Sequence, residues 1–360
     1  MFEFIDGAAE DESTLRRNTE AFLDYDLVPR YLVDVREVDL NTRVLGTELA
    51  WPVVLAPTGM SRLFHHTGEI SVARAAARSG TIYSLSTTSS VSIEDVARGT
   101  EGPKMFQVYV FRDDALNLEL IERCKQADYS AMCLTVDVPA LGNRERDVRT
   151  GMTIPPTFGL GSWLDFALHP AWVWNYITKP RLKPANVEHR IDRRSRNLRT
   201  IAAWVNSQYD PSVTWERAER MIENWGDPFA IKGVLSSEDA RRAVEIGATA
   251  VIVSNHGGRQ LDGAVASLDV LGEIVEAVGG RAEIILDGGI RRGSHVIKAL
   301  ALGADACMIG RPYLYGLGAG GERGVDRALT ILKTEIERVM RLLGCCRIGD
   351  LDAGFLRRRH

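Results

Sequence analysis

The fold is decided by a repeating unit that residues 283–311, EIILDGGIRRGSHVIKALALGADACMIGR, contain in full. The run 283–286 is short and mostly apolar, as a buried strand is, and glycines follow it. Residues 293–302 have the apolar spacing of an amphipathic helix, and 306–309 is a second short apolar run. A strand, a helix and a strand in this order predict a parallel βαβ unit.

The same alternation extends over most of the chain. Further strands are expected at 53–56, 81–85, 104–110, 131–136, 229–232 and 250–253, and further helices at 69–78, 93–98, 113–127, 237–246, 268–278 and 326–343. Eight strands alternating with helices, with 326–343 closing the series, favour a closed (β/α)8, or TIM, barrel over an open doubly wound sheet. We therefore expect the 360 residues to form a single domain of the α/β class.

A long insert, about residues 139–210, interrupts the series after the fourth strand and exceeds an ordinary loop. Its first part is aromatic and apolar, with Phe158, Trp163, Leu164, Phe166, Trp172, Trp174, Tyr176 and Ile177. Its second part is basic, with Lys179, Arg181, Lys183, Arg190, Arg193, Arg194, Arg196 and Arg199. This pattern is typical of a membrane-interface segment. The alternative is a lid over the active site or a flap packed on a neighbouring subunit.

Charge and cysteine content exclude several classes of protein. A formal net charge of −4 gives no general affinity for nucleic acid. The five cysteines have no zinc-site spacing, no metal is expected, and free thiols indicate a reducing compartment. No secretory signal or run of about 20 apolar residues is present. We expect a cytoplasmic protein, peripheral on the inner face of the membrane if the insert binds lipid.

Polar residues and glycines gather where the expected strands end, which is where barrel enzymes place their chemistry. They are Pro57, Thr58 and Gly59 after the first strand, Ser86 after the second, Gln107 and Tyr109 on one face of the third, Thr135, Asp137 and Arg144 at the fourth, Lys232 at the fifth, Ser254 to Asp262 (SNHGGRQLD) after the sixth, Asp287, Gly288, Gly289 and Arg291 after the seventh, and Gly310 and Arg311 after the eighth.

The last two strand ends predict a phosphate site. Glycines let backbone N–H groups approach an anion, and Arg291 and Arg311 add positive charge. A phosphate site after strands 7 and 8 is frequent in this fold. The alternative is that both glycine-containing segments are only turns.

His256 lies on the loop after the sixth strand, with Arg259 three residues further on. A single histidine is more often structural, but a general base beside a cationic carboxylate site is a coherent unit. Asp137 is positioned to hold the imidazole in one tautomer. Lys232 ends an apolar strand, which is costly unless the ammonium faces an anion.

At these residues the chain resembles the FMN-dependent 2-hydroxy acid oxidases and dehydrogenases, a family that includes glycolate oxidase, L-lactate dehydrogenase and mandelate dehydrogenase. The resemblance runs from DGAAED (6–11) to the last helix, and SNHGGRQLD (254–262) is its most specific stretch. The helical segment that usually precedes the position of Asp6 in the family is expected to be missing.

The resemblance implies FMN and a set of contacts to it. Pro57, Thr58 and Gly59 match the edge of the isoalloxazine near N5; Ser86, Gln107 and Thr135 match its hydrogen-bond partners; Lys232 matches the lysine near N1 and O2; Ser254 lines the ribityl chain; and Asp287, Gly288, Gly289, Arg291, Gly310 and Arg311 match the ribityl and phosphate contacts. For the substrate, Arg144 and Arg259 match the carboxylate pair and Tyr109 the tyrosine near the hydroxyl. His256 matches the catalytic base and Asp137 its partner.

Three positions depart from the family pattern. Phe4 replaces a tyrosine that contacts the carboxylate, and the lost hydroxyl is worth roughly 1–3 kcal/mol if nothing replaces it. Thr88 stands where glycolate oxidase has tryptophan, which leaves room for a larger substrate. Gly59 stands where typical oxidases carry alanine, as in the dehydrogenase branch and in a lactate monooxygenase.

The implied reaction is oxidation of a lactate- or mandelate-like 2-hydroxy acid to the 2-keto acid. His256 removes a proton while two electrons pass to FMN and then to a quinone, a cytochrome or oxygen, and the α-hydrogen leaves as hydride or as a proton. A homotetramer is implied by the resemblance alone. Two alternatives stay open, namely a flavin-free phosphate-binding barrel enzyme such as an aldolase or epimerase, and a flavin-binding protein without turnover.

Overall fold

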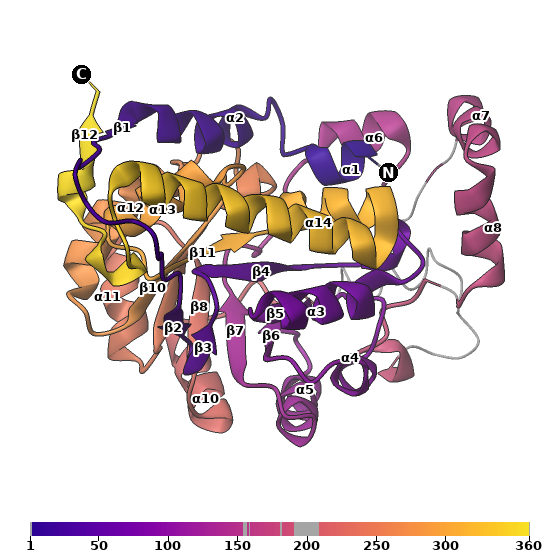
Figure 1. Cartoon of the computed structure of the whole chain (residues 1–360). Helices are drawn as coiled ribbons and strands as arrows, with labels where there is room; N and C mark the ends of the chain where they lie inside the picture. Colours follow the sequence, from indigo (N-terminus) through magenta and orange to yellow (C-terminus); the bar gives the residue numbers. More distant parts are fainter. Residues whose placement is uncertain (1, 154–156, 158, 181, 191–208, 360) are drawn as a thin grey trace.

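The computed structural model describes residues 2–153, 157, 159–180, 182–190 and 209–359. Eight parallel strands close into a barrel in chain order, as the sequence predicts (Figure 1). These strands are β4 (Val53–Thr58), β5 (Tyr83–Ser86), β6 (Lys104–Val108), β7 (Ala131–Thr135), β8 (Phe229–Val234), β9 (Ala250–Val253), β10 (Glu283–Asp287) and β11 (Ala306–Ile309).

Helices between successive strands cover the outside of the barrel. They are α3 (Gly68–Ser79), α4 (Ile93–Gly99), α5 (Asp114–Gln126), α10 (Trp215–Trp225), α11 (Ser237–Glu245), α12 (Ser267–Val278), α13 (Gly293–Ala301) and α14 (Arg311–Leu343). The sequence predicts six of these helices near their observed bounds, but it predicts α14 only from Asp326, although the helix begins at Arg311. It misses α10, whose buried Ala218, Met221 and Ile222 have helical spacing.

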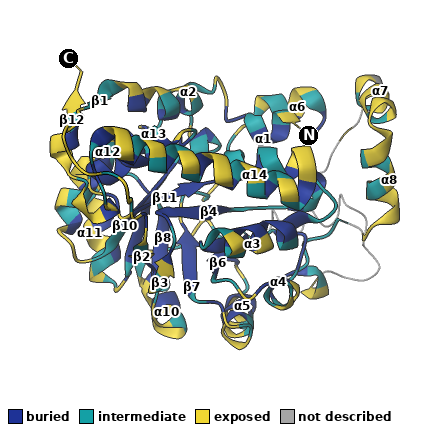
Figure 2. Ribbon diagram, viewed as in Figure 1, coloured by how far each residue is buried: buried dark blue, intermediate teal, exposed yellow. Residues whose placement is uncertain are grey.

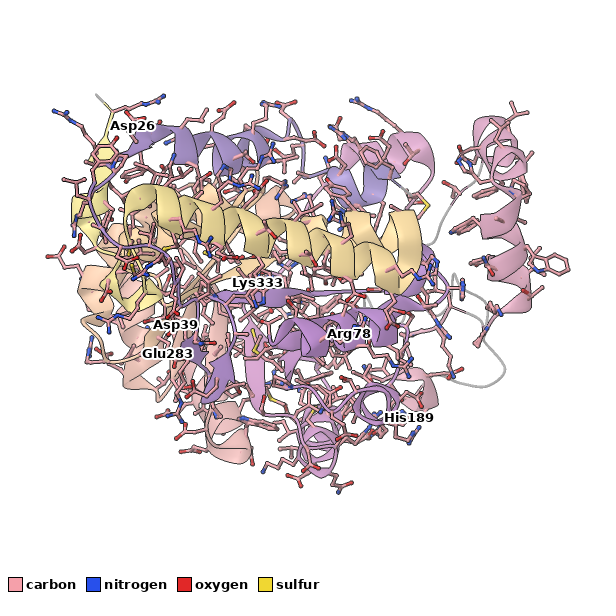
Figure 3. All side chains as sticks on the ribbon, in the orientation of Figure 1. Asp26, Asp39, Arg78, His189, Glu283 and Lys333 are labelled. Carbon is pink, nitrogen blue, oxygen red and sulfur yellow. The ribbon has the colours of Figure 1, made fainter. Side chains whose placement is uncertain are left out.

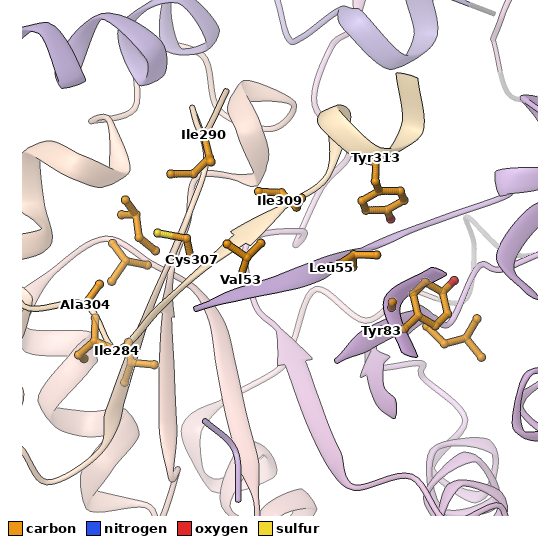
Figure 4. Close-up of a cluster of buried hydrophobic side chains, with 14 of the residues drawn as sticks. Val53, Leu55, Tyr83, Ile284, Ile290, Ala304, Cys307, Ile309 and Tyr313 are labelled. Carbon is orange, nitrogen blue, oxygen red and sulfur yellow. The ribbon is translucent and has the colours of Figure 1, made fainter. Parts of the chain in front are cut away.

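Side chains alternate between two cores. The barrel interior holds Val54, Ala56, Ile82, Met105, Ala131, Cys133, Ala230, Ala250, Ile252, Ile285, Ala306 and Met308. Neighbouring residues such as Val53, Leu55 and Ile309 point outward into the layer between strands and helices (Figure 4). Because both faces of every strand are covered, the strands read as continuous apolar runs, and buried residues dominate the strands in Figure 2.

Two small sheets and the N-terminal segment complete the barrel. A hairpin of β2 (Thr42–Val44) and β3 (Thr47–Leu49) adds Val44, Leu45 and Leu49 to the interior core. Strand β1 (Tyr25–Leu27) pairs with β12 (Leu356–Arg358) and so joins the two ends of the chain.

The N-terminal residues form helix α1 (Phe2–Asp6), where the sequence predicts none, and helix α2 (Ser13–Glu20). Helix α1 is fixed by Arg146, whose Nη1 lies 3.0 Å from carboxylate oxygens of both Glu3 and Asp6. The Ala9 N–H donates to the Gly258 carbonyl at 2.9 Å. This segment therefore lies beside the loop that carries His256.

Helix α14 is broken at Gly320 and Gly321, and it packs along α3 (Figure 1). Arg78 of α3, labelled in Figure 3, bridges to Glu322 at 2.7 Å and to Asp326 at 2.8 Å on α14. These ion pairs hold the part of α14 that follows the break, and Arg311 and Tyr313 lie in its first turn, before the break.

The insert contributes α6 (Glu145–Thr150), α7 (Leu160–Leu168) and α8 (Pro170–Thr178), and the last two project from one side of the molecule (Figure 1). Both are largely exposed (Figure 2), although the Trp172 Nε1 donates to the Leu63 carbonyl at 3.0 Å. Phe158, Arg181, Arg193, Arg194, Arg196 and Arg199 lie outside the described residues. Across the described ranges, no helix combines the length and the apolar character needed to cross a membrane.

Candidate active site

Seven of the predicted cofactor residues share one inward-facing layer at the carboxyl end of the barrel. Six of them lie two residues beyond a side chain of the interior core, and Ser86 lies four residues beyond Ile82. Because side chains alternate along a strand, all seven also point inward. The layer consists of Ser86, Gln107, Thr135, Lys232, Ser254, Asp287 and Gly310. One polar layer therefore collects residues from seven strands.

Two polar atoms in this layer are buried without a nitrogen or oxygen partner among the described residues. They are the Gln107 Nε2 and the Thr135 Oγ1. The other end of the Gln107 amide is satisfied, because the Ser86 Oγ donates to its Oε1 at 3.0 Å. Unpaired buried groups are costly, about 1–3 kcal/mol each. A donor and a hydroxyl left unpaired on one cavity wall fit the polar edge of a planar heterocycle such as a flavin.

Lys232 is buried and charged within the same layer. Its Nζ lies 2.6 Å from the Asp287 Oδ2 and donates to the Ser254 Oγ at 2.7 Å, and Ser254 donates to Asp287 at 2.7 Å. Burial alone would lower the pKa of Lys232, but the Asp287 and Asp137 carboxylates outweigh it and raise the pKa above the usual value. The ammonium therefore stays protonated next to the cofactor cavity.

His256 and Asp137 are brought together as the sequence analysis expects. The His256 Nδ1 lies 2.8 Å from the Asp137 Oδ1. His256 adopts φ 59°, a left-handed conformation, and its N–H donates to the Ser254 Oγ at 3.0 Å. Burial would raise the pKa of Asp137, but His256 and Lys232 hold it below its usual range. With Nδ1 fixed by a carboxylate, Nε2 is the nitrogen left to act on a substrate.

Arg144 and Arg259 both lie close to the ring of Phe4. Their guanidinium carbons are 5.3 Å and 5.1 Å from the Phe4 ring centroid, within cation–π range. The Arg259 Nη1 also donates to the carbonyls of Phe4 and Gly7 at 2.8 and 2.9 Å. Phe4 thus presents an aromatic ring to both guanidinium groups and has no hydroxyl to donate.

The positive charge at Arg259 is only partly compensated. Arg144 has its own ion pair, with its Nε 2.7 Å from the Asp147 Oδ2. Burial, and then the like charges of Arg144 and Arg311, lower the pKa of Arg259 to about 9. A buried guanidinium with a lowered pKa favours an incoming anion, and a carboxylate matches its planar fork.

The residues expected at the phosphate are also clustered, but several have additional contacts. Arg311 donates to the carbonyls of Ile5, Gly257 and Gly7 at 2.9, 3.0 and 2.9 Å. Burial, followed by the charge of Arg291, lowers its pKa to about 10. In the described part of the chain no ion pair is formed by either arginine. The two arginines therefore place positive charge without an ion pair of their own at the expected phosphate site.

The two glycines of this cluster have different reasons to lack a side chain. Gly288 has φ 110°, which only glycine adopts readily. Gly289 has φ 74°, and a Cβ there would overlap the Asn18 carbonyl of α2. Packing against α2 thus accounts for Gly289 independently of any phosphate.

Sequence reasoning missed two aromatic residues. Tyr209, at the end of the insert, bridges Phe111 in an isolated β-bridge and packs edge-on against Tyr109, with ring centroids 5.4 Å apart. Tyr313 lies buried in the first turn of α14. The partners of both residues lie far away in the sequence, so no local pattern could have indicated either.

Fold and site define an α/β-barrel enzyme with a polar cofactor cavity beside a histidine–aspartate pair and two arginines. The family model for FMN-dependent dehydrogenases matches residues 1–358. The chain belongs to the FMN-dependent dehydrogenase family, and FMN is the cofactor that membership implies.

Similar proteins are named for the oxidation of lactate or mandelate. The chain is 43% identical to a protein named L-lactate oxidase from Nostoc sp., over 99% of this chain and 93% of that one. It is 40% identical to an L-lactate dehydrogenase from Xanthomonas axonopodis pv. citri, over 99% and 92%. The solved structure of the monotopic membrane protein (S)-mandelate dehydrogenase superposes with a TM-score of 0.94 at 38% identity, over 99% and 94%.

Proposed function

We propose that the protein oxidises a 2-hydroxy acid to the corresponding 2-keto acid with FMN. The observation that carries this proposal is the 2.8 Å contact between His256 and Asp137, in which His256 lies on the loop that also holds Arg259. A base and a carboxylate-binding cation on one loop suit a substrate whose carboxylate is adjacent to the carbon that reacts.

FMN, when bound, supplies the two-electron acceptor of this chemistry. The residues proposed to hold its ring are Pro57, Thr58, Gly59, Ser86, Gln107, Thr135 and Lys232, and those proposed for its ribityl and phosphate groups are Ser254, Asp287, Gly288, Gly289, Arg291, Gly310 and Arg311. The unpaired Gln107 Nε2 and Thr135 Oγ1 support the first set. The positive charges of Arg291 and Arg311, which form no ion pair within the described residues, support the second.

The chain's own residues divide the remaining work. Arg144 and Arg259 bind the substrate carboxylate, and Tyr109 lies near its hydroxyl. The His256 Nε2 takes a proton from the substrate, and the Asp137 carboxylate stabilises the imidazolium that results. Phe4 and Thr88 line the substrate site.

Lactate-like and mandelate-like acids are the proposed substrate class. Relatives named for lactate and a structural neighbour named for mandelate support this range. Thr88 in place of a tryptophan gives room for a side chain larger than that of glycolate.

The proposed electron acceptor is a quinone or cytochrome rather than oxygen, because Gly59 follows the dehydrogenase pattern. We place the protein in the cytoplasm, at the inner face of the membrane, as a homotetramer. The exposed apolar faces of α7 and α8 support membrane contact, with Leu168 78% and Ile177 73% exposed. A neighbour described as a monotopic membrane protein is consistent with it.

An anaerobic titration tests the function. The purified protein should be yellow, and a panel of 2-hydroxy acids should bleach its flavin absorption. A colourless protein that gains no flavin on incubation with FMN would favour a flavin-free barrel enzyme. A yellow protein that no acid bleaches would be a flavin-binding protein without turnover.

A further inference from the structure

The end of strand β4 is irregular where it reaches the cofactor cavity. Pairing with β5 is regular at Leu55, opposite Tyr83, and then shifts, so that Thr58 lies opposite Leu85. Pro57, inside the irregular stretch, has no N–H to donate to a neighbouring strand. Such a bulge re-aims the backbone and leaves groups that the ladder does not satisfy.

The Tyr313 hydroxyl bonds to one backbone group and one side-chain group of this stretch. It donates to the Ala56 carbonyl at 2.6 Å, and its oxygen lies 2.7 Å from the Thr58 Oγ1. Because the single phenol proton is used on Ala56, the Thr58 hydroxyl is the donor of the second bond. Figure 4 shows the Tyr313 ring reaching from the start of α14 toward β4.

This contact connects the residues expected at the flavin ring with those expected at the phosphate. Tyr313 is two residues after Arg311, in the same helical turn. Gly310 meets β4 directly, since a Cβ on it would lie 3.8 Å from the Ala56 Cβ and 3.9 Å from the Thr58 Cγ2. Gly59 follows Thr58 immediately. The turn that begins α14 therefore fixes the backbone at the expected flavin edge.

We propose that Tyr313 is a positioning residue, whose hydroxyl holds the irregular end of β4 and Gly59 in register with the flavin. This inference rests on the proposed function. Tyr313 is fully buried, and burial raises the pKa of its phenol, so the hydroxyl remains a donor at every working pH. Removing it would leave the Ala56 carbonyl and the Thr58 hydroxyl without this partner, and the bulge would relax.

The test compares Tyr313→Phe with Tyr129→Phe in the holoenzyme. Tyr129 is also buried, and its hydroxyl also donates to a backbone carbonyl, that of Ile93 at 3.1 Å, outside the site. Five quantities are measured: the thermal midpoint, the FMN dissociation constant of the apoprotein, the dissociation constant of the sulfite adduct of the flavin, the limiting rate of flavin reduction, and the substrate Kd.

Both variants should lose similar thermal stability, since each loses one buried hydrogen bond. Only Tyr313→Phe should shift the sulfite dissociation constant and lower the reduction rate, each by about tenfold, because small misplacements at a reacting centre are expensive. Its substrate Kd should stay within about twofold, because the arginine pair is untouched.

A Tyr313→Phe protein with wild-type sulfite affinity and reduction rate would overturn the inference, and so would equal changes in Tyr129→Phe. If Tyr313→Phe does not fold, Thr58→Val decides instead, because it removes only the second bond. It should shift sulfite affinity and reduction rate in the same direction, and no shift would overturn the inference. Failure of the wild type to bleach with any acid would instead refute the proposed function.

Discussion

Gly59 and Thr88 are in steric contact: a Cβ built on Gly59 would overlap the Thr88 hydroxyl and lie 3.4 Å from the Thr88 Cβ. The Thr88 Oγ1 is also 3.1 Å from the Ser86 Oγ, which donates to Gln107. The two positions that depart from the family pattern therefore constrain each other sterically. Hydrogen bonds connect Thr88 to Ser86 and Gln107 of the inward layer.

Gly59→Ala should therefore act through Thr88. We expect the added methyl group to displace the Thr88 side chain, disturb the bonds to Ser86 and Gln107, and weaken FMN binding by about tenfold, or roughly 1–2 kcal/mol. The double variant Gly59→Ala/Thr88→Ala should recover most of this loss, and Thr88→Ala alone serves as the control. Equal FMN dissociation constants for the two Gly59 variants would contradict the coupling.

Substrate size should also depend on Thr88. The wild type is expected to use mandelate-like or longer acids with a higher kcat/KM than glycolate. Thr88→Trp should lower kcat/KM for mandelate by about tenfold or more while changing glycolate less, because the ring fills the space beside Gly59. Steady-state kinetics with an artificial quinone measure both effects. The prediction fails if glycolate is the best substrate of the wild type.

Most of the barrel could be predicted because its strands are buried on both faces and its polar residues sit at the strand ends. Strand alternation predicted that Gln107 and Tyr109 share a face, and the other residues of the inward layer were predicted from their positions at strand ends. The remaining contacts join residues far apart: Tyr313 and Ala56 are separated by 257 positions. Helix α1 forms because Arg146 pairs with Glu3 and Asp6, and no local sequence pattern encodes such a contact.

Replacing His256 should mainly slow flavin reduction, whereas replacing Arg259 should also weaken acid binding. His256→Gln removes the base but not the carboxylate site, so flavin reduction should fall about 10²–10⁴-fold while the Kd of the unreactive acid oxalate changes little. Arg259→Lys keeps one charge but loses the planar fork and one of the cations facing Phe4, so oxalate should bind at least about tenfold more weakly. Stopped-flow reduction and spectral titration separate the two. Wild-type reduction by His256→Gln would refute the proposed base.

Asp137→Asn gives a matched test of the histidine's partner. The amide preserves shape but does not stabilise the imidazolium, so flavin reduction should fall with little change in oxalate binding. Together the three variants distinguish proton transfer from carboxylate binding.

Membrane contact should depend on the exposed apolar residues of α7 and α8. Leu168 and Ile177 are 78% and 73% exposed. Burying a large apolar side chain contributes roughly 1.5–3 kcal/mol, so Leu168→Glu/Ile177→Glu should lower the vesicle partition coefficient by about 100-fold. Cosedimentation with phosphatidylglycerol vesicles at low salt measures it, and FMN content should not change.

Leu118→Glu is the control, because Leu118 is an exposed leucine on α5, 47% exposed and distant from α7 and α8. Loss of vesicle binding in this variant as well would show a nonspecific charge effect. A wild type that never cosediments would favour the alternatives of a lid or a subunit contact. Lys183 and Arg190 should contribute little to vesicle binding, because both are in ion pairs. Lys183 lies 2.5 Å from Glu188, and Arg190 lies 2.7 Å from Glu119.

The free energy of unfolding should decrease as the pH decreases, because of His295. This residue supports the loop of the expected phosphate site. Its ring stacks on Phe22 with centroids 4.2 Å apart, and its Nδ1 lies 3.2 Å from the Gly289 carbonyl. Burial, assisted by the charges of Lys298, Arg291 and Arg292, lowers its pKa from 6.5 to about 4. The folded protein therefore holds the neutral ring at pH values where the unfolded chain is protonated.

The unfolded state binds the extra proton between about pH 6.5 and pH 4, so the contribution of His295 is complete above this window and is lost as pH falls through it. His295→Gln abolishes the titration but keeps a donor for Gly289, and His169→Gln, which removes an exposed histidine, is the control. Urea unfolding at fixed FMN concentration should show the wild type losing stability relative to His295→Gln as pH falls from 6.5 to 4. A difference between these two proteins that is independent of pH would mean that His295 is protonated equally in both states, and the loop would then have another source of acid sensitivity.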